Sequence, residues 1–248
     1  MLPVYVINLA SSRERRLKVC RRLEALGVSY EIFEAVDGRQ APHPLFDRYD
    51  DKRRKRYRRK PLSGGELGCG ASHFLLWQKC ADLNQPIVVM EDDVYVTNAF
   101  PAALDIAEGL INRLRYLRLA GTSLHRRPYR VVSNVGAFDL VDHIRGPSGT
   151  LCYVLHPSAA RALIAHAESW YLAVDDYMDR YWQHGVDCFS LMPFPVMVAD
   201  NSSDIVRKPK EKTSLWGKLV QELFGRLERV RRTLYRMRTG KNRRLESH

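Results

Sequence analysis

The chain has 248 residues, of which 45% are hydrophobic and 27% charged, and its formal net charge is +12. This composition is that of a globular protein with one main domain, since a domain holds roughly 100 to 200 residues. No apolar stretch approaches the roughly 20 residues of a membrane-spanning helix, and no basic and apolar leader opens the chain. We therefore expect neither a membrane span nor a signal peptide.

Five cysteines are scattered along the chain, and none of them forms a Cys-x-x-Cys pair. Disulfide frameworks of secreted proteins and structural zinc sites both use closely spaced cysteines. The pattern therefore predicts free thiols, a reducing cytoplasmic compartment and no zinc site.

The positive charge is concentrated in two segments. Residues 52–60 hold eight Lys and Arg and no acid, and residues 207–244 hold fourteen Lys and Arg against three Glu. The summed net charge of these two segments exceeds the net charge of the whole chain, so the remaining residues are mildly acidic. A basic protein of this kind can bind nucleic acid, but no zinc-finger, RNP or helix-turn-helix pattern accompanies the charge. We expect no nucleic-acid partner.

The N-terminal segment reads as a β-α-β unit. Residues 4–9 form an apolar, β-branched strand, residues 13–26 a helix that ends at Gly27, and residues 30–36 a second strand that closes on Asp37 and Gly38. Two strands joined by a helix predict a parallel sheet with a ligand crevice at its strand ends. No Gly-x-Gly-x-x-Gly is present, which disfavours a dinucleotide site.

Residues 42–60 are predicted to be a loop, either solvated or in contact with an anionic ligand. A helix is then predicted from Glu66 to Leu83, and it contains Gly68 and Gly70. Glycine inside a helix costs roughly 1 kcal/mol relative to alanine, so these two predict close approach by a backbone or a ligand. Ser72 and His73 lie beside them, and His73 is either structural or a catalytic candidate.

Three consecutive acids, Glu91, Asp92 and Asp93, follow the apolar strand at residues 86–90. Side chains two residues apart on a strand point the same way, so Glu91 and Asp93 can share one ion at the carboxyl end of the sheet. Carboxylate oxygens suit Mg²⁺ or Mn²⁺. The alternative is an acidic turn that caps the next helix.

A second acidic group is predicted near the end of the main domain. The elements between the two groups are a helix at 100–112, strands at 116–120 and 153–155, and irregular β structure at 129–138. After an alanine-rich helix at 157–169, Asp175 and Asp176 precede another helical segment. Either acid can serve as a helix N-cap as well as in chemistry.

The tail predicts a basic amphipathic helix, because apolar residues recur there at helical spacing with Lys and Arg on the other faces. Such a helix can pack on the main domain or lie on an anionic membrane surface, and we favour the membrane. The apolar positions are Trp216, Leu219, Val220, Leu223, Phe224, Leu227, Val230 and Leu234.

Four motifs, in order, resemble glycosyltransferase family 25, which includes bacterial lipooligosaccharide galactosyltransferases and collagen galactosyltransferases. The chain is most similar to the bacterial branch. The motifs are residues 4–9 with Arg13 and Arg16, residues 33–38, residues 65–69 with Ser72 and His73, and residues 89–94.

The resemblance implies an α/β, GT-A-like (Rossmann-like) domain at residues 1–205 with a mostly parallel central sheet, followed by a basic amphipathic helical tail at residues 206–248. It implies an inverting, metal-dependent transferase that moves galactose from UDP-galactose to a lipopolysaccharide or lipooligosaccharide core sugar, with a β-1,4 bond. The protein would then be cytoplasmic and peripheral on the inner face of the bacterial inner membrane.

The resemblance also distributes roles among the candidate residues. Asp93 would bind the Mn²⁺ or Mg²⁺ ion with help from Glu91 or Asp92, and Asp175 or Asp176 would act as the base. The nucleotide sugar would contact residues at the strand ends, and Ser72 and His73 match the family motif without an assigned role. The nucleotide-sugar residues are Asn8, Arg13, Asp37, Ser72, His73 and Asp92.

Two other functions are compatible with the residues. A nucleic-acid-binding protein would use the basic loop and tail, and a metal-dependent phosphohydrolase would use the clustered carboxylates. The phosphohydrolase would need more metal ligands than the sequence supplies.

Overall fold

The computed structural model describes residues 1–40, 42–58, 60–122, 128–199 and 215–240, and the side chains of 215–221 are not described. The predicted domain boundary at 205/206 and the side chains of Trp216, Leu219 and Val220 therefore lie outside the described residues. No described helix has the length and apolar character needed to cross a bilayer.

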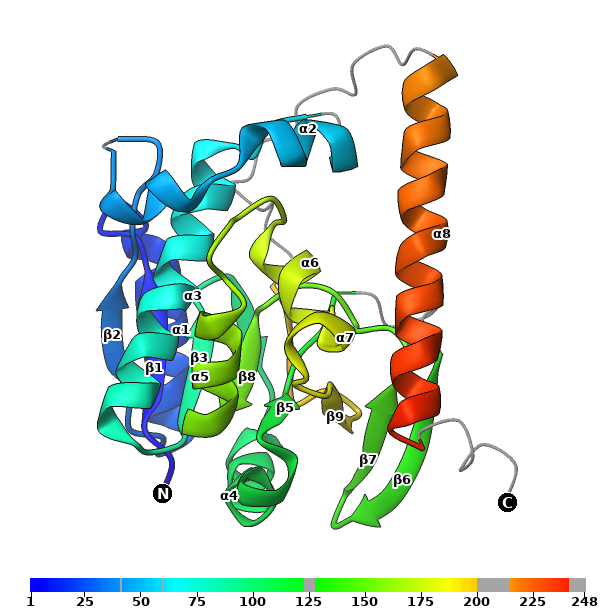
Figure 1. The fold of residues 1–248 in the computed structure, drawn as a ribbon. Helices are drawn as coiled ribbons and strands as arrows, with labels where there is room; N and C mark the ends of the chain where they lie inside the picture. Colours follow the sequence, from blue (N-terminus) through cyan, green and yellow to red (C-terminus); the bar gives the residue numbers. More distant parts are fainter. Residues whose placement is uncertain (41, 59, 123–127, 200–214, 241–248) are drawn as a thin grey trace.

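An eight-stranded sheet forms the centre of the molecule, in the order β2-β1-β3-β8-β5-β9-β7-β6 (Figure 1). Strands β10 and β4 form a small second sheet. The strands are β1 Val4–Asn8, β2 Glu31–Glu34, β3 Ile87–Glu91, β4 Val94–Val96, β5 Tyr116–Arg118, β6 Tyr129–Val135, β7 Phe138–His143, β8 Cys152–Leu155, β9 Phe189–Met192 and β10 Val196–Val198.

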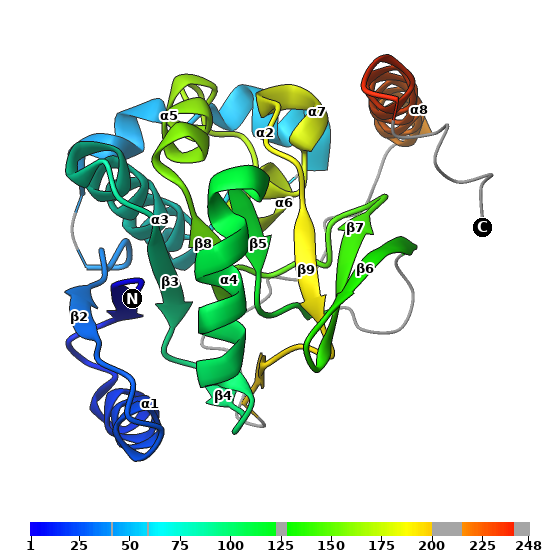
Figure 2. The same ribbon diagram turned by 90° about the horizontal axis from the view of Figure 1, so that it is seen from below.

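Helices cover both faces of the large sheet (Figure 2). Helices α1 and α4 share one buried core with alternate residues of β1, β3 and β8, and α3, α5 and α6 share the other core with the intervening residues. The helical segments are α1 Arg13–Ala25, η1 Pro44–Arg48, α2 Asp51–Arg58, α3 Gly64–Leu83, α4 Phe100–Leu114, α5 Pro157–Ala165, α6 Val174–Met178, α7 Tyr181–His184 and α8 Leu215–Arg238.

The prediction of a mostly parallel sheet is wrong. Strand β1 is parallel to β2 and β3, and β5 is parallel to β9, but the other four pairings are antiparallel. Strand β8 enters the sheet from the end at which β3 leaves it, so the Glu91 amide donates to the Leu151 carbonyl at 2.8 Å. The loop before β8, residues 146–151, therefore lies beside the acidic residues that follow β3.

The predicted loop at residues 42–60 is also wrong, because it contains η1 and α2. Arg54 is only 3% exposed, and its guanidinium donates to the carbonyls of Lys60 at 3.0 Å and Tyr171 at 3.4 Å. The Arg53 guanidinium lies 3.7 Å from the centre of the Tyr171 ring. Part of the basic run is thus structural, and Arg59 lies outside the described residues.

One of the two helix glycines has the close approach that the sequence predicts. A Cβ atom on Gly68 would lie 2.2 Å from the Val36 carbonyl oxygen, whereas one on Gly70 would come no nearer than 3.8 Å to any atom outside its own helix, at Trp170. The N-terminal half of α3 therefore presses directly on the backbone that follows β2.

We expect Gly68→Ala to lower the free energy of unfolding by about 1–3 kcal/mol or more, because the clash is with backbone that cannot rotate away. The matched variant Gly70→Ala is expected to be neutral or to stabilise by up to about 1 kcal/mol, since alanine is the better helix former. Urea denaturation of both variants checks this, and equal destabilisation by the two would contradict the assigned contact.

Candidate functional site

The carboxyl ends of β1 and β3 bring together an amide, a carboxylate and a guanidinium. Asn8 is 3% exposed, and its Nδ2 donates to Asp92 Oδ2 at 2.5 Å. On the other side of the carboxylate, Arg15 Nε lies 3.5 Å from Asp92 Oδ1. Asp92 is therefore held in place by two elements of the N-terminal β-α-β unit.

The sequence motif points to Arg13, but the structure places Arg15 at this position. Arg13 is exposed at the start of α1, whereas Arg15 is half-buried and lines the cavity next to Asp92. The phase of α1 relative to the sheet decides which arginine turns inward, and the spacing of the motif does not contain that information.

A cavity of about 300 Å³ lies at this edge of the sheet. It is bounded by the ends of β1 and β3, the segment after β2, and the N-terminal half of α3. Asp37 lies on its rim with its carboxylate 3.1 Å from Arg39 Nε, and this hydrogen-bonded guanidinium lowers the pKa of the Asp37 carboxyl. The polar residues that line the cavity are Arg15, Asp37, Arg39, Ser63, Cys69, Ser72, His73, Glu91, Asp92 and Asp93.

Helix α3 forms one wall of the cavity, and a capping box stabilises the start of this helix. The Ser63 hydroxyl accepts from the Glu66 amide at 3.1 Å, and the Glu66 carboxylate accepts from the Ser63 amide at 2.7 Å. Ser72 accepts from the Val36 amide at 2.9 Å and donates to the Gly68 carbonyl at 2.8 Å. The Ser72 hydroxyl therefore ties α3 to the segment after β2.

His73 and Glu91 face each other at the bottom of the cavity. The side chain of His73 is fully buried, with Nδ1 2.9 Å from the Tyr153 hydroxyl and Nε2 3.4 Å from Glu91 Oε1. Thr150 donates to the same Glu91 oxygen at 2.5 Å. Burial alone would raise the pKa of Glu91, but the His73 and Thr150 contacts outweigh it and lower the pKa.

Asp93 has a different environment. Its Oδ1 atom is buried and accepts no hydrogen bond from any residue in the described part of the chain. Burial, reinforced by the negative charges of Glu91 and Asp92, raises the pKa of Asp93 to about 7. A carboxylate in this position is stabilised only by a proton or by a cation.

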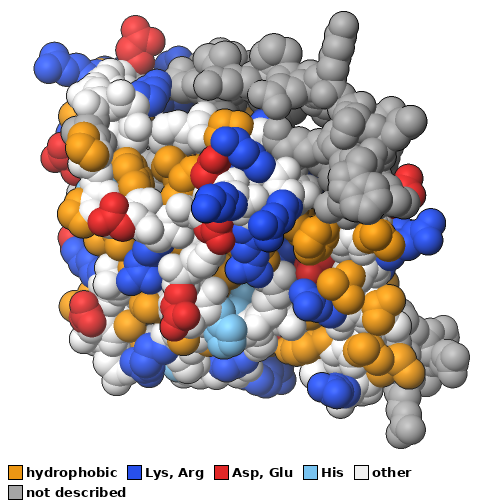
Figure 3. All heavy atoms as spheres, turned by 45° about the horizontal axis from the view of Figure 1, so that its top comes forward, with side chains coloured by type: hydrophobic (Ala, Val, Ile, Leu, Met, Phe, Trp, Pro, Cys, Tyr) orange, Lys and Arg blue, Asp and Glu red, His pale blue; other side chains and the backbone are white. Residues whose placement is uncertain are grey.

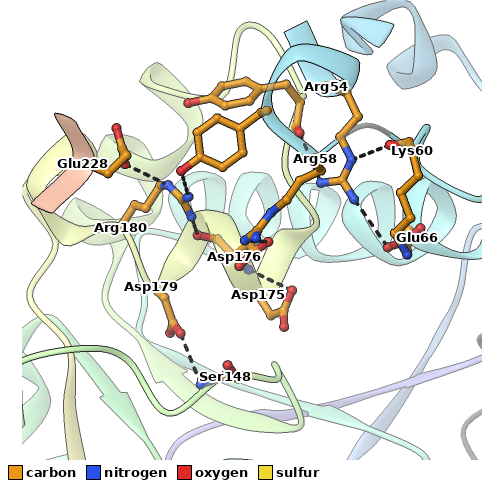
Figure 4. A network of polar contacts seen from close by, with 12 residues as sticks. Arg54, Arg58, Lys60, Glu66, Ser148, Asp175, Asp176, Asp179, Arg180 and Glu228 are labelled. Carbon is orange, nitrogen blue, oxygen red and sulfur yellow. Dashed lines mark hydrogen bonds and ion pairs between the residues drawn. The ribbon is translucent and has the colours of Figure 1, made fainter. Parts of the chain in front are cut away.

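The two acids of α6 differ in their contacts. Asp175 Oδ2 accepts from the Gly149 amide at 3.4 Å, and Asp175 also interacts electrostatically with the Cys69 thiol in the cavity wall. Asp176 turns toward α2, where Arg58 Nη2 donates to its Oδ2 at 2.7 Å (Figure 4). Asp175 is thus the acid of the pair that lies near Gly149 and Cys69, although it does not line the cavity itself.

Sequence reasoning missed the support of the loop at residues 146–151. The buried Arg118 guanidinium donates to the carbonyls of Ser148 and Gly149 and, at 2.8 Å, to Asp179 Oδ1. Asp179 in turn accepts from the Ser148 amide at 3.1 Å. This ion pair fixes the loop that presents Thr150 to Glu91 and the Gly149 amide to Asp175. The available signal in the sequence was Arg118, an arginine within the otherwise apolar predicted strand at residues 116–120.

A protein-family model covers most of the chain. The family model described as "Glycosyltransferase family 25 (LPS biosynthesis protein)" matches residues 1–178, which include every strand and helix around the cavity and both acidic groups.

The chain belongs to glycosyltransferase family 25.

Several curated relatives in animals are similar to this family 25 chain. The inactive glycosyltransferase 25 family member 3 of Mus musculus is 27% identical over 227 residues, which is 81% of this chain and 37% of the relative. Procollagen galactosyltransferase 2 of Homo sapiens is 27% identical over 196 residues, 74% of this chain and 31% of the relative. A glycosyltransferase 25 family member of Aedes aegypti is 37% identical over 103 residues, 37% of this chain and 16% of the relative. The chain thus spans well under half the length of these relatives.

A divalent cation fits the acidic residues of this family 25 chain. The buried Asp93 Oδ1 atom, which has no hydrogen-bond partner among the described residues, can serve as a ligand oxygen, and the carboxylates of Glu91 and Asp92 add negative charge around it. Strand β3 ends at Glu91, and residues 92 and 93 form a bend. The alternation that suggested one ion shared by Glu91 and Asp93 therefore does not extend to Asp93, and the shared ion stays a prediction.

Proposed function

We propose that the protein is an inverting galactosyltransferase that uses UDP-galactose as donor and a hydroxyl of a lipopolysaccharide or lipooligosaccharide core sugar as acceptor, with a β-1,4 product. The family assignment supports a nucleotide-sugar donor. The names of the procollagen galactosyltransferases among the relatives support galactose, and the family's description as an LPS biosynthesis protein supports the acceptor.

The observation that carries this proposal is Asp93 in its cavity. Asp93 would hold Mn²⁺ or Mg²⁺, which when bound neutralises the diphosphate leaving group as a Lewis acid. Asn8 and Arg15 fix Asp92 beside it, and Asp37 with Arg39 lies across the cavity where the nucleoside would bind. Some relatives carry the word inactive in their names, so the activity of this chain is part of the proposal.

Asp175 is the proposed base. Inversion in one displacement needs a group that takes the proton of the acceptor hydroxyl on the face opposite the leaving diphosphate. Asp175 lies on α6 near Cys69, which lines the cavity that also holds the acids after β3, and a hydrogen bond from the Gly149 amide orients its carboxylate. Asp176 forms an ion pair with Arg58, which makes it the weaker candidate for the base.

A donor screen tests the proposed function. Purified protein is incubated with UDP-galactose, UDP-glucose or UDP-N-acetylglucosamine, with Mn²⁺ or EDTA, and with or without a lactose- or glucosamine-ended acceptor. We expect UDP release that requires UDP-galactose, Mn²⁺ and an acceptor. Release of UMP and galactose 1-phosphate in the absence of any acceptor would instead identify a metal-dependent phosphohydrolase, which hydrolyses the diphosphate bridge.

Helix α8 is the proposed membrane contact. One face is docked on the main domain, because Glu228 is only 9% exposed and its carboxylate lies 3.1 Å from Arg180 Nε and Trp182 Nε1. Apolar side chains recur every three or four residues along α8 and are between 42% and 62% exposed. These side chains, which we call the outer stripe, are Leu223, Leu227, Val230, Leu234 and Met237.

Arginines flank the outer stripe on α8. Arg226, Arg229, Arg231 and Arg238 are all exposed, and Figure 3 shows hydrophobic and basic side chains interleaved on the side of the molecule along which α8 runs. Each cation near anionic lipid contributes about 1 kcal/mol, and the apolar side chains add burial at the headgroup boundary. We propose that this stripe holds the protein on the inner face of the bacterial inner membrane.

The double variant Leu227→Asp/Val230→Asp is expected to reduce binding to anionic vesicles by about tenfold or more, because it removes apolar burial and adds negative charge. The charge-matched control Leu17→Asp/Leu83→Asp changes exposed leucines on α1 and α3 and should bind like the wild type. Vesicle co-sedimentation measures both. Equal binding by the wild type and the α8 variant would rule out the outer stripe as the contact.

A further inference from the structure

A second group of metal-ligating side chains lies in the wall of the cavity. Cys69 and His73 are one turn apart on α3, and Glu91 ends β3. One ligand atom from each of these three residues lies within 4.8 Å of the other two. All three residues line the cavity, so an ion from solvent can reach them.

The imidazole of His73 is arranged as metal-bound histidines are. Its ring is 0% exposed, Nδ1 is held by the Tyr153 hydroxyl at 2.9 Å, and Trp77 Nε1 donates to that hydroxyl at 3.0 Å. Nε2 points toward Glu91 and has no hydrogen-bond partner among the described residues. Metal-binding histidines typically use one nitrogen as ligand while the other makes a hydrogen bond.

The charge around Cys69 favours a cation. The carboxylates of Glu91, Asp175 and Asp93 act electrostatically on the Cys69 thiol, so negative charge gathers around it. A divalent ion bound there would displace the thiol proton and compensate these carboxylates.

The ligand set selects a particular kind of metal. A thiolate, an imidazole and a carboxylate together suit Zn²⁺, whereas an all-oxygen site such as Asp93 suits Mg²⁺ or Mn²⁺. We propose that Cys69, His73 and Glu91 form a zinc site separate from the ion at Asp93. Three protein ligands leave a fourth position to water, as in zinc sites that are not purely structural.

This proposal reverses the expectation from cysteine spacing. That expectation rested on pairs of cysteines in one tight turn, which structural zinc sites use. Here one cysteine and one histidine share a helix face four residues apart, and the third ligand arrives from a strand end through the fold. The competing interpretation is a histidine that only orients Glu91 and binds no metal.

Cobalt is the probe that separates these interpretations, since Co²⁺ bound by a thiolate has a charge-transfer absorption band and Co²⁺ bound by oxygen and nitrogen alone lacks it. Metal-free full-length protein is titrated with Co²⁺ and then with Zn²⁺. We expect the band at one equivalent, and its loss when Zn²⁺ displaces Co²⁺. The absence of the band in the wild type would overturn the proposal.

Three variants test whether the Cys69 thiolate is the source of the cobalt band. Cys69→Ser should abolish it and weaken Zn²⁺ binding at least tenfold, while Cys20→Ser, a half-buried cysteine on α1, should keep it. Asp93→Asn should also keep it, because Asp93 is not one of the three ligands. A band that survives in Cys69→Ser, or one that is lost in Asp93→Asn, would overturn the separate site.

The readout needs no turnover. A protein without transferase activity can still show the cobalt band, and an active transferase can lack it. The zinc site and the proposed function are therefore distinguishable in the same preparation.

Discussion

Replacing Asp93 with asparagine is expected to lower Mn²⁺-dependent transfer at least about 100-fold, because it removes the free carboxylate oxygen that would bind the ion opposing the charge of the leaving diphosphate. Asn8 and Arg15 hold Asp92, not Asp93, so the local backbone should stay in place. UDP release under saturating UDP-galactose measures the effect, and electron paramagnetic resonance measures the loss of bound Mn²⁺.

The same variant is expected to be more stable than the wild type when metal is absent. The pKa of Asp93 is raised from 3.8 to about 7 in the folded chain, so between these values the folded state binds more protons than the unfolded state. Stability contributed by the protonated carboxyl is present at low pH and is lost as the pH rises through about 7. Asparagine carries no such loss, so the difference in melting temperature should grow from pH 4 to pH 7 and level off above that.

Asp82→Asn is the matched control, since Asp82 is exposed near the end of α3. It should keep activity and show the pH dependence of the wild type. Mn²⁺ should raise the melting temperature of the wild type and of Asp82→Asn but not that of Asp93→Asn. Full activity in Asp93→Asn would refute the role of Asp93 in metal binding. A stability difference between Asp93→Asn and the wild type that does not change with pH would refute the raised pKa of the buried Asp93 carboxyl.

Asp175→Asn is expected to lower kcat by about 10²–10⁴-fold with little change in the KM for UDP-galactose, because it removes the proton acceptor and leaves the donor cavity intact. Asp176→Asn should lower kcat by less than about tenfold, since it disturbs only a half-exposed ion pair with Arg58. Steady-state kinetics with both substrates varied separates the two acids.

A larger loss in Asp176→Asn than in Asp175→Asn would exchange their roles. Arg58→Gln serves as a control, because it breaks the same ion pair without removing a carboxylate. If the effect of Asp176→Asn comes only from that pair, Arg58→Gln should reproduce it. If neither aspartate variant loses activity, the base lies outside α6.

Local patterns predicted β1, α1, β2, α3 and β3, but they missed α2, β9 and β10 and the direction of β8. The apolar run before Glu91 and the apolar pattern from Glu66 to Leu83 are local signals, and β3 and α3 formed where they predicted, with α3 starting two residues earlier at Gly64. The antiparallel entry of β8 between β3 and β5 depends on pairing with β3 across more than 60 residues of sequence, and no local pattern in the chain encodes it.

The candidate site shows the same limit at the level of side chains. The strand-end argument predicted that acids would gather after β3, and Asn8 and Asp92 do meet there. It could not predict that Arg15 would turn inward instead of Arg13, or that Arg54 would be buried among other cations. Both outcomes depend on how helices rotate against their neighbours, which composition does not specify.

The antiparallel insertion of β8 also bears on how the site forms during folding. Thr150 and Gly149 reach their carboxylate partners only after β8 has paired with β3, and the loop that this pairing closes is long and entropically costly. Proteins dominated by such non-local pairings fold slowly. We therefore expect catalytic competence to emerge late in refolding, together with the last cooperative gain of structure, so that activity regained after dilution from denaturant follows the slow phase of that recovery.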